Sequence, residues 1–347
     1  MTAFFKRNGN PFLAFIGLAL LIALIIFLPR LFPSGYMINA MIDSVRWIIF
    51  ALSFDLLAGH IGAVSLGHPV FFGLGAYITA ILGPMLGLGF VGRTVLSAVL
   101  MALVALVAGI AFFRIRRVTF AIGTLGALII TQLVVNNAYE LTGGPLCIRG
   151  VARPQFTLPF SETALRITTP TQYYYLLLPL LLVTVLVYFA LTRSRIGRSF
   201  TAVREDEVRA SAFGIFPLRY KLLAFAVGAG LVGALGSFQA QYITVVCPTD
   251  IALQLTTLLL IIVFVGGVGS MRGVIIGAII FSSLPRILET QGAAAISPAY
   301  QQIAYGFILV VVMIFFPDGL DGLLTRTAGR MRKRYRSWFP SDEAKDE

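Results

Sequence analysis

The chain contains 347 residues, of which 58% are hydrophobic and only 12% are charged. A soluble domain of this length needs more polar residues to cover its surface, which excludes an ordinary globular fold in water. The net charge of +12 would suggest a nucleic-acid partner in a soluble protein, but no aromatic-and-basic RNA-binding motif and no zinc-finger spacing accompany it, so no nucleic-acid partner is expected.

Ten apolar segments follow one another along the chain. Most approach the roughly 20 residues that a helix needs to cross about 30 Å of hydrocarbon. Their apolar residues are continuous and do not alternate with polar ones, which argues against a membrane β-barrel. The sequence therefore predicts an all-α, polytopic transmembrane helical bundle of about 10 spans, at 12–28, 36–58, 63–82, 94–113, 118–138, 172–192, 220–242, 251–267, 273–288 and 300–316.

The first segment begins after Lys6 and Arg7, as the apolar part of a signal peptide would. No small-residue cleavage site follows it, so we interpret it as a span that is retained. Two joins between segments are short, at 59–62 and around 266–273. Joins of this length are either tight turns or breaks in re-entrant helices.

The basic residues are distributed unevenly between the two sides of the predicted bundle. With the N-terminus placed in the cytoplasm, 20 of the 27 Lys and Arg residues fall in cytoplasmic segments and six fall on the opposite side. The positive-inside rule favours this orientation, with both termini cytoplasmic. The predicted parts are a cytoplasmic N-terminus at 1–11, a transmembrane domain at 12–316 with an external loop at 139–171 and a cytoplasmic loop at 193–219, and a basic cytoplasmic tail at 317–347.

The cytoplasmic loop carries an amphipathic pattern. Apolar residues recur near a helical period with charges between them, at Phe200, Val203, Val208, Ala212 and Phe213. Gly214 suits a helix C-cap and Pro217 a helix stop, so we predict one or two short helices along the cytoplasmic face. Such a helix can rest on anionic lipid headgroups. The three successive carboxylates at 205–207 instead favour a protein partner with a pocket of its own.

The same loop resembles the cytoplasmic loop of the branched-chain amino-acid ABC permeases, and in particular of the larger of their two permease subunits. The resemblance rests on Arg-Ile-Gly-Arg at 195–198, Ala-Val-Arg-Glu-Asp-Glu at 202–207, Ala-Phe-Gly-Ile at 212–215 and Arg-Tyr-Lys-Leu-Leu-Ala-Phe at 219–225. In that family the loop docks onto the ATPase subunit. The resemblance thus implies ATPase-coupling residues at Arg198, Arg204, Glu205, Asp206, Glu207, Phe213 and Gly214. The Glu-Ala-Ala start of many other bacterial import permeases is replaced here by Val208-Arg209-Ala210.

Further stretches resemble the same family. They are the glycine-rich run at 58–68 with its continuation at 71–77, the segments at 120–125 and 136–154, the run at 265–277, and Phe-Phe-Pro-Asp-Gly-Leu at 315–320. Broken helices in transporters hold polar substrate groups with exposed backbone groups, so we expect residues 62–77 to line the pathway. The candidate pathway residues are Ser65, Gly67, His68, Gly73, Gly75, Tyr77 and Asn136. The alternative is close packing of small residues between helices, and a lone histidine such as His68 is more often an internally bonded one.

Three charged residues, Asp43, Arg46 and Asp55, lie in the second predicted span. Ionised groups at membrane depth are costly and are usually paired or face water. Asp43 and Arg46 are three residues apart and share a helix face, so we expect a structural ion pair, with a substrate site as the alternative. Asp55 lies near the inner end, where we expect it to reach water, and nearby His60 is expected at the membrane interface.

The external loop faces the side from which an imported substrate arrives. In the resembled family a soluble binding protein delivers substrate there, and the arginines of this loop at 149, 153 and 166 can meet acidic groups on it. Cys147 and Cys247 both fall on this oxidising side, and whether they pair stays open because their distance is unknown. They form no CxxC pair, and the sequence has no metal-spaced histidines, so neither a metal nor a cofactor is expected.

The chain has no GxxxxGK[ST] phosphate loop, so we expect neither ATP hydrolysis nor another enzymatic activity. The resemblance implies a permease subunit of an ABC importer in a bacterial inner membrane, for branched-chain or related hydrophobic amino acids. Besides the lipid bilayer, its implied partners are two ATP-binding subunits, a second, related permease subunit and an extracytoplasmic substrate-binding protein. The alternatives are a permease for urea or short amides and an ion-coupled secondary transporter using Asp43 or Asp55. An integral membrane enzyme ranks last, because no catalytic motif is present.

Overall fold

The computed structural model describes residues 29–30, 34–114, 117–156, 165–290, 306–307, 319–320 and 322. Its long helices are α3 (Gly35–Ala58), α4 (His68–Met85), α5 (Phe90–Phe112), α6 (Arg117–Asn137), α8 (Pro170–Arg193), α11 (Pro217–Ile243), α12 (Leu253–Gly266) and α13 (Met271–Thr290). Its short helices are α7 (Tyr139–Thr142), α9 (Arg195–Glu205) and α10 (Glu207–Ala212), with 3-10 turns η1 (Gly144–Leu146) and η2 (Pro248–Ile251). Two-residue strands pair as β1 (Ile148–Arg149) with β4 (Val245–Val246), and as β2 (Gln155–Phe156) with β3 (Leu165–Arg166). The predicted first and last spans and most of both predicted terminal segments lie outside the described residues.

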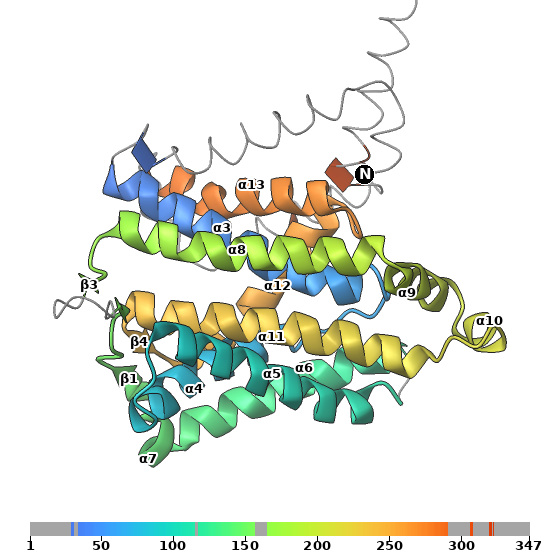
Figure 1. The fold of residues 1–347 in the computed structure, drawn as a ribbon, viewed down its shortest axis with the longest axis horizontal. Coiled ribbons are helices and arrows are strands. Elements are labelled where there is room, and N and C mark those ends of the chain that lie inside the picture. The colour runs from blue at the N-terminus through green and yellow to red at the C-terminus, as the bar shows by residue number, and fades with distance from the viewer. Residues whose placement is uncertain are drawn as a thin grey trace, which may run out of the picture.

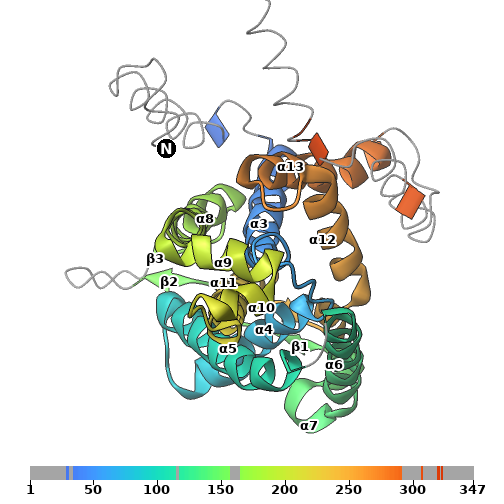
Figure 2. The same cartoon turned by 90° about the vertical axis from the view of Figure 1, so that its right-hand side faces the viewer.

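Most of the long helices run side by side along one axis (Figure 1), whereas α12 crosses that axis (Figure 2). Helices α9 and α10 lie at one end of this bundle, and α7 with β1, β3 and β4 lies at the other. We call these the α9–α10 end and the strand end. The predicted helical bundle is thus confirmed for the described residues, with four two-residue strands added to it, while the number of spans and the sides of the termini stay predictions.

The outer surface of the bundle suits hydrocarbon. Five of the described helices, α4, α5, α6, α8 and α11, are long and apolar enough to cross a membrane. Large apolar side chains are exposed along the outer helices, among them Val107 on α5, Ile122 on α6 and Leu186 on α8. An apolar surface of this extent is unusual for a soluble monomer, but it is what lipid tails require.

Helix α11 lies near the middle of the bundle when it is viewed along its axis (Figure 2). It packs against α3, α4 and α5, and its residues from Ala224 to Gln241 are nearly all buried. Small residues allow this packing, because helix backbones in a membrane approach closely only where side chains are short. A Cβ at Gly236 would overlap the Phe72 carbonyl oxygen of α4, and a Cβ at Gly75 would overlap the Gly233 carbonyl oxygen of α11.

Replacing Gly75 by alanine is expected to destabilise the bundle. The added Cβ would lie 2.8 Å from the Gly233 Cα, so backbone rather than a mobile side chain must yield. Overpacking of this kind costs about 1–3 kcal/mol, which should lower the midpoint of thermal unfolding in detergent. The matched control is Gly126→Ala in α6, where no atom lies within 4 Å of the added Cβ. Equal midpoints for the two variants would contradict the packing described here.

The chain between α3 and α4 is a buried irregular segment, residues 59–67, rather than a tight turn. The helix that corresponds to the predicted span at 63–82 accordingly begins at His68, five residues later than predicted. Side chains from other helices satisfy the backbone of Leu66, since its N–H donates to Thr124 Oγ1 (3.0 Å) and its carbonyl accepts from Thr256 Oγ1 (2.9 Å). This segment is therefore a break between helices whose polar groups are bonded inside the protein, as membrane depth demands.

A disulfide joins Cys147 to Cys247 at the strand end. It connects the segment after α6 to the segment after α11, and β1 and β4 pair beside it with Ile148 opposite Val246. The pairing that the sequence left open is thus formed. It fixes the ends of α6 and α11 to one another across a sequence separation of 100 residues.

Loss of this disulfide is expected to lower stability. Cross-links that close loops of about 100 residues stabilise by up to about 4–5 kcal/mol in chain-entropy models. We expect Cys147→Ser to lower the unfolding midpoint in detergent, and reductant to have the same effect on the wild type. Cys247→Ser should lower the midpoint by the same amount. The double variant should be no less stable than either single variant, because one substitution already removes the bond. Additive losses in the double variant would show that the two cysteines act independently.

Candidate functional site

Helix α9 is amphipathic, as predicted. Its N-cap, Ser194, accepts a hydrogen bond from the Ile196 N–H (3.1 Å), which begins the helix. Phe200 and Val203 are fully buried on its inner face, and the Phe200 ring meets Tyr220 of α11 edge to face at 6.2 Å. The opposite face of α9 carries exposed charges, including Arg198 and Glu205.

Asp206 ends α9 and caps α10. Its Oδ1 accepts hydrogen bonds from the N–H groups of Val208 (2.9 Å) and Arg209 (3.1 Å). The hydrogen bond from Arg209 is the main cause that holds the pKa of the Asp206 carboxyl below its ordinary value, so the cap is ionised at neutral pH. Next to it, Glu207 receives a bond from Lys221 Nζ at 2.5 Å, which fastens α10 to α11. Asp206 and Glu207, two of the predicted coupling residues, therefore hold α10 in its position between α9 and α11.

Helix α10 and the residues between it and α11 expose large apolar side chains. Val208 is 80% exposed, Phe213 85% and Phe216 59%, and α10 projects beyond the end of the bundle (Figure 1). We call these three residues the tip patch. Gly214 takes a positive φ of 76° and ends this segment, as predicted for a C-cap. Pro217 was expected to stop a helix, but it begins α11 instead, because proline suits the first turn.

A buried carboxylate joins three segments near this end of the bundle, and an arginine beside it adds a fourth. Asp55, at the end of α3, accepts hydrogen bonds from the Tyr188 hydroxyl of α8 (2.6 Å) and from the Gly269 N–H between α12 and α13 (2.8 Å). The Tyr188 hydroxyl has one hydrogen, and it uses this hydrogen in its bond to Asp55. In its contact with His60 Nε2 (2.9 Å), the Tyr188 oxygen is therefore the acceptor. The fourth segment is α9, whose Arg204 donates a hydrogen bond through Nη1 to the Gly59 carbonyl. We call this set the Asp55 network.

One sequence expectation is corrected by this network. Asp55 was expected to reach water, but it is fully buried and bonded to groups far away in the sequence. The expected place of His60 at the membrane interface stays a prediction; its side chain is partly buried, and its ring lies 5.4 Å from the Tyr188 ring. One indication of this network was present in the sequence. Asp55 is an acidic residue near the end of an apolar segment, and an acidic residue that is buried there needs hydrogen-bond or charged partners.

The predicted pathway residues divide into two kinds. The glycines make close backbone contacts: Gly67 faces the Thr124 carbonyl oxygen, Gly73 faces Ile251, and Gly75 faces α11. Side-chain groups of Ser65, His68 and Tyr77 are buried, and the Ser65 Oγ, His68 Nδ1 and Tyr77 hydroxyl have no hydrogen-bond partner within the described part of the chain. Asn136 lies in the last turn of α6, and its backbone carbonyl oxygen would be 2.9 Å from a Cβ at Gly144.

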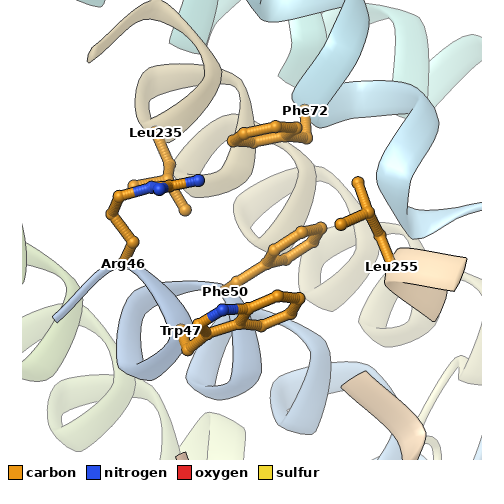
Figure 3. Close-up of a pocket in the computed structure, with 6 residues that line it drawn as sticks. All are labelled: Arg46, Trp47, Phe50, Phe72, Leu235 and Leu255. Carbon is orange, nitrogen blue, oxygen red and sulfur yellow. The ribbon is translucent and has the colours of Figure 1, made fainter. Parts of the chain in front are cut away.

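A narrow pocket lies between four helices beside this segment. Its lining comes from α3, α4, α11 and α12, as Figure 3 shows, and consists of Arg46, Trp47, Phe50, Phe72, Leu235 and Leu255. The expected ion pair is present, with Arg46 Nη1 at 2.6 Å from Asp43 Oδ1. The Phe50 ring stacks on Phe72 at 5.4 Å and lies 6.1 Å from the His68 ring, so the pocket adjoins the predicted pathway segment.

Comparison with known proteins places this architecture in a family. Residues 36–313 match the family described as branched-chain amino acid transport system, permease component. The chain belongs to this family. No solved structure matches it.

Relatives of this permease include both kinds of subunit. The chain is 31% identical over 291 residues to the high-affinity branched-chain amino acid transport system permease protein LivM of Escherichia coli K12, covering 79% of the chain and 67% of that protein. It is 30% identical to the LivM of Salmonella typhimurium LT2, with the same coverage. It is 26% identical over 307 residues to LivH of Escherichia coli K12, covering 82% of the chain and 94% of LivH.

Family membership confirms several sequence predictions. The chain is a permease subunit of an ABC importer and a multi-pass membrane protein. It is not an enzyme, since in an ABC system ATP hydrolysis belongs to the partner subunits. The sequence signals that indicated this family, at the α9–α10 end and in the glycine-rich segments, lie within or beside the matched residues.

Proposed function

We propose that this chain forms half of the translocation pathway of a bacterial inner-membrane importer for branched-chain or related hydrophobic amino acids. Two ATP-binding subunits drive it, a second, related permease subunit completes the pathway, and an extracytoplasmic binding protein delivers the substrate. The names of the relatives support this substrate class. The observation that carries the mechanism is the tip patch, which is exposed apolar surface on a charged, firmly held helix pair.

The tip patch is the proposed contact with the ATP-binding subunit. Aromatic residues with charged neighbours are typical of the central part of protein interfaces. Adsorption to anionic lipid is the alternative, but Glu205, Asp206 and Glu207 would be repelled by anionic headgroups. Arg198, Arg204 and Glu205 then form the charged surround of the contact, while Asp206 and Glu207 hold α10 in position.

The Asp55 network is the proposed link from this contact to the membrane helices. Arg204 belongs to α9 and bonds the Gly59 carbonyl, and Gly59 directly follows α3. A displacement of α9 by the ATP-binding subunit would therefore act on α3, and through Asp55 on α8 and on the turn between α12 and α13. Alternating access requires that the ATP-bound state favour one arrangement of these helices over the other.

The proposed orientation places the α9–α10 end in the cytoplasm and the strand end outside. The disulfide supports this orientation, because disulfides persist on the oxidising side of a bacterial inner membrane. In this frame residues 1–11 and 317–347 are cytoplasmic, and residues 12–316 form the transmembrane domain. The unpartnered polar groups of Ser65, His68 and Tyr77 support a pathway role for segment 62–77, because buried polar groups normally have partners.

Uptake by proteoliposomes that contain the whole complex and its binding protein tests this function. With ATP on the side of the ATP-binding subunits, we expect accumulation of leucine, isoleucine and valine, and much less of urea or short amides. Accumulation driven by an ion gradient without ATP would favour a secondary transporter instead. Preferred uptake of urea or an amide would keep the importer but overturn the proposed substrate class.

A further inference from the structure

The pocket between α3, α4, α11 and α12 combines one guanidinium group with apolar walls. Its aromatic side forms a stack, in which Trp47 lies 5.8 Å from Phe50 and Phe50 lies 5.4 Å from Phe72, with ring planes 13° and 21° apart. Leu235 and Leu255 form the aliphatic side. Figure 3 shows the Arg46 side chain on one side of this space and the Trp47 and Phe50 rings facing it.

Arg46 uses only part of its hydrogen-bonding capacity. Its Nη1 donates to Asp43 Oδ1 at 2.6 Å, whereas its Nε is buried and has no hydrogen-bond partner among the described residues. A guanidinium binds a carboxylate best side-on, through Nε and the adjacent Nη2, and Nη1 does not belong to that edge. The Asp43 pair therefore orients Arg46 while it leaves the side-on edge for another acceptor.

The surroundings of Arg46 match a zwitterion with an aliphatic side chain. An anionic group can accept a hydrogen bond from the buried Nε–H of Arg46. Branched aliphatic carbons can pack against Phe50, Phe72 and Leu255, which line the pocket. Asp250, between α11 and α12, contributes negative charge to the electrostatic surroundings of Arg46. A neutral amide or urea would bring no anionic group to the buried Nε–H of Arg46.

We infer that Arg46 binds the α-carboxylate of the transported amino acid, with the aliphatic side chain against Phe50, Phe72 and Leu255. This inference rests on the proposed function and assigns a site to its substrate. The pocket is narrow in the present conformation. The substrate therefore enters when α11 or α12 moves away from α3, which alternating access between two arrangements provides.

A photoactivatable diazirine analogue of leucine tests the site in the assembled complex. The binding protein, loaded with this probe, is mixed with the complex during ATP turnover, illuminated, and the labelled peptides are identified by mass spectrometry. We expect label on the peptides that contain Phe50, Phe72 and Leu255, and we expect leucine to compete it away. Label confined to other helices would overturn the assignment.

Substitutions separate recognition from folding. Arg46→Gln is combined with Asp43→Asn, so that no single buried charge is left without its partner. We expect a loss of probe labelling of roughly tenfold or more, because a charge-assisted bidentate contact is lost. Restoring the cation with Arg46→Lys should recover only part of it, since lysine cannot bind side-on. Unchanged labelling in the Gln/Asn variant would show that the ion pair is structural only.

A second variant leaves the ion pair intact. Leu255→Trp fills the pocket and should abolish leucine labelling and uptake, whereas Leu253→Trp, on the exposed side of the same helix, should preserve both. Equal uptake by these two variants would overturn the site. If the wild-type complex fails to accumulate leucine with ATP, the proposed function fails; if the wild type accumulates leucine but neither Arg46 nor Leu255 matters, only the site assignment fails.

Discussion

Alanine at both Val208 and Phe213 is expected to weaken binding of the ATP-binding subunit by about 100-fold and to abolish ATP-driven uptake. A central aromatic hot spot such as Phe213 contributes about 2 kcal/mol or more, and with a smaller contribution from Val208 the sum reaches the ~2.7 kcal/mol that corresponds to a factor of 100. Both side chains are highly exposed and make little contact with the rest of the chain, so the permease should still fold. Co-purification with the ATP-binding subunit and uptake by proteoliposomes measure the two effects.

The matched control for this prediction is Tyr139→Ala. Tyr139 is a large exposed aromatic residue on α7, at the strand end, which the proposed orientation places outside the cell. Its removal should leave ATPase binding unchanged. Normal ATPase binding by the Val208/Phe213 variant, or an equal loss in the Tyr139 variant, would refute the tip patch as the contact.

Alanine at Asp55 is expected to uncouple ATP hydrolysis from transport. The substitution leaves the Tyr188 hydroxyl and the Gly269 N–H without their acceptor inside the protein, and each such loss costs about 1–3 kcal/mol. With α8 and the α12–α13 turn no longer fastened to the end of α3, a displacement of α9 should reach fewer helices. We expect the number of leucine molecules transported per ATP hydrolysed to fall several-fold.

Two further variants distinguish coupling from simple destabilisation. Tyr188→Phe removes one donor from the network but keeps the ring, so it should lower the coupling ratio less than Asp55→Ala does. Thr184→Ala, one turn away on α8, removes a buried hydroxyl whose partner among the described residues is the Leu180 carbonyl of the same helix. It should leave the ratio of transport to hydrolysis unchanged. An equal ratio of transport to hydrolysis in the wild type and the three variants would show that the Asp55 network has no part in coupling.

Local patterns explain why much of the fold could be predicted from the sequence. Helix α9 follows from the helical spacing of Phe200 and Val203. The pair of Asp43 and Arg46 could be predicted because residues three apart on a helix share a face. Each of these predictions depends on residues within one or two helical turns.

Contacts between distant segments could not be predicted in this way. Asp55 meets Tyr188 and Gly269, which follow it by 133 and 214 residues, and nothing near Asp55 indicates those partners. The distance between Cys147 and Cys247 depends on how α6 and α11 are packed, which periodicity does not give. Glycine content predicted close approach or broken helices in the run at 58–68 and its continuation at 71–77, but the sequence did not distinguish them. The structure contains both, a break at 59–67 and close packing at Gly75.

The central claim is that the α9–α10 end of this permease is the contact for the ATP-binding subunit. A photo-crosslinking amino acid placed at position 213 of the intact complex, in native membranes, tests it directly, with the same residue at position 139 as the comparison. Illumination should join position 213 to the ATP-binding subunit and leave position 139 without that product. A product between position 213 and the extracytoplasmic binding protein, or an ATPase adduct at position 139 alone, would contradict both the contact and the orientation.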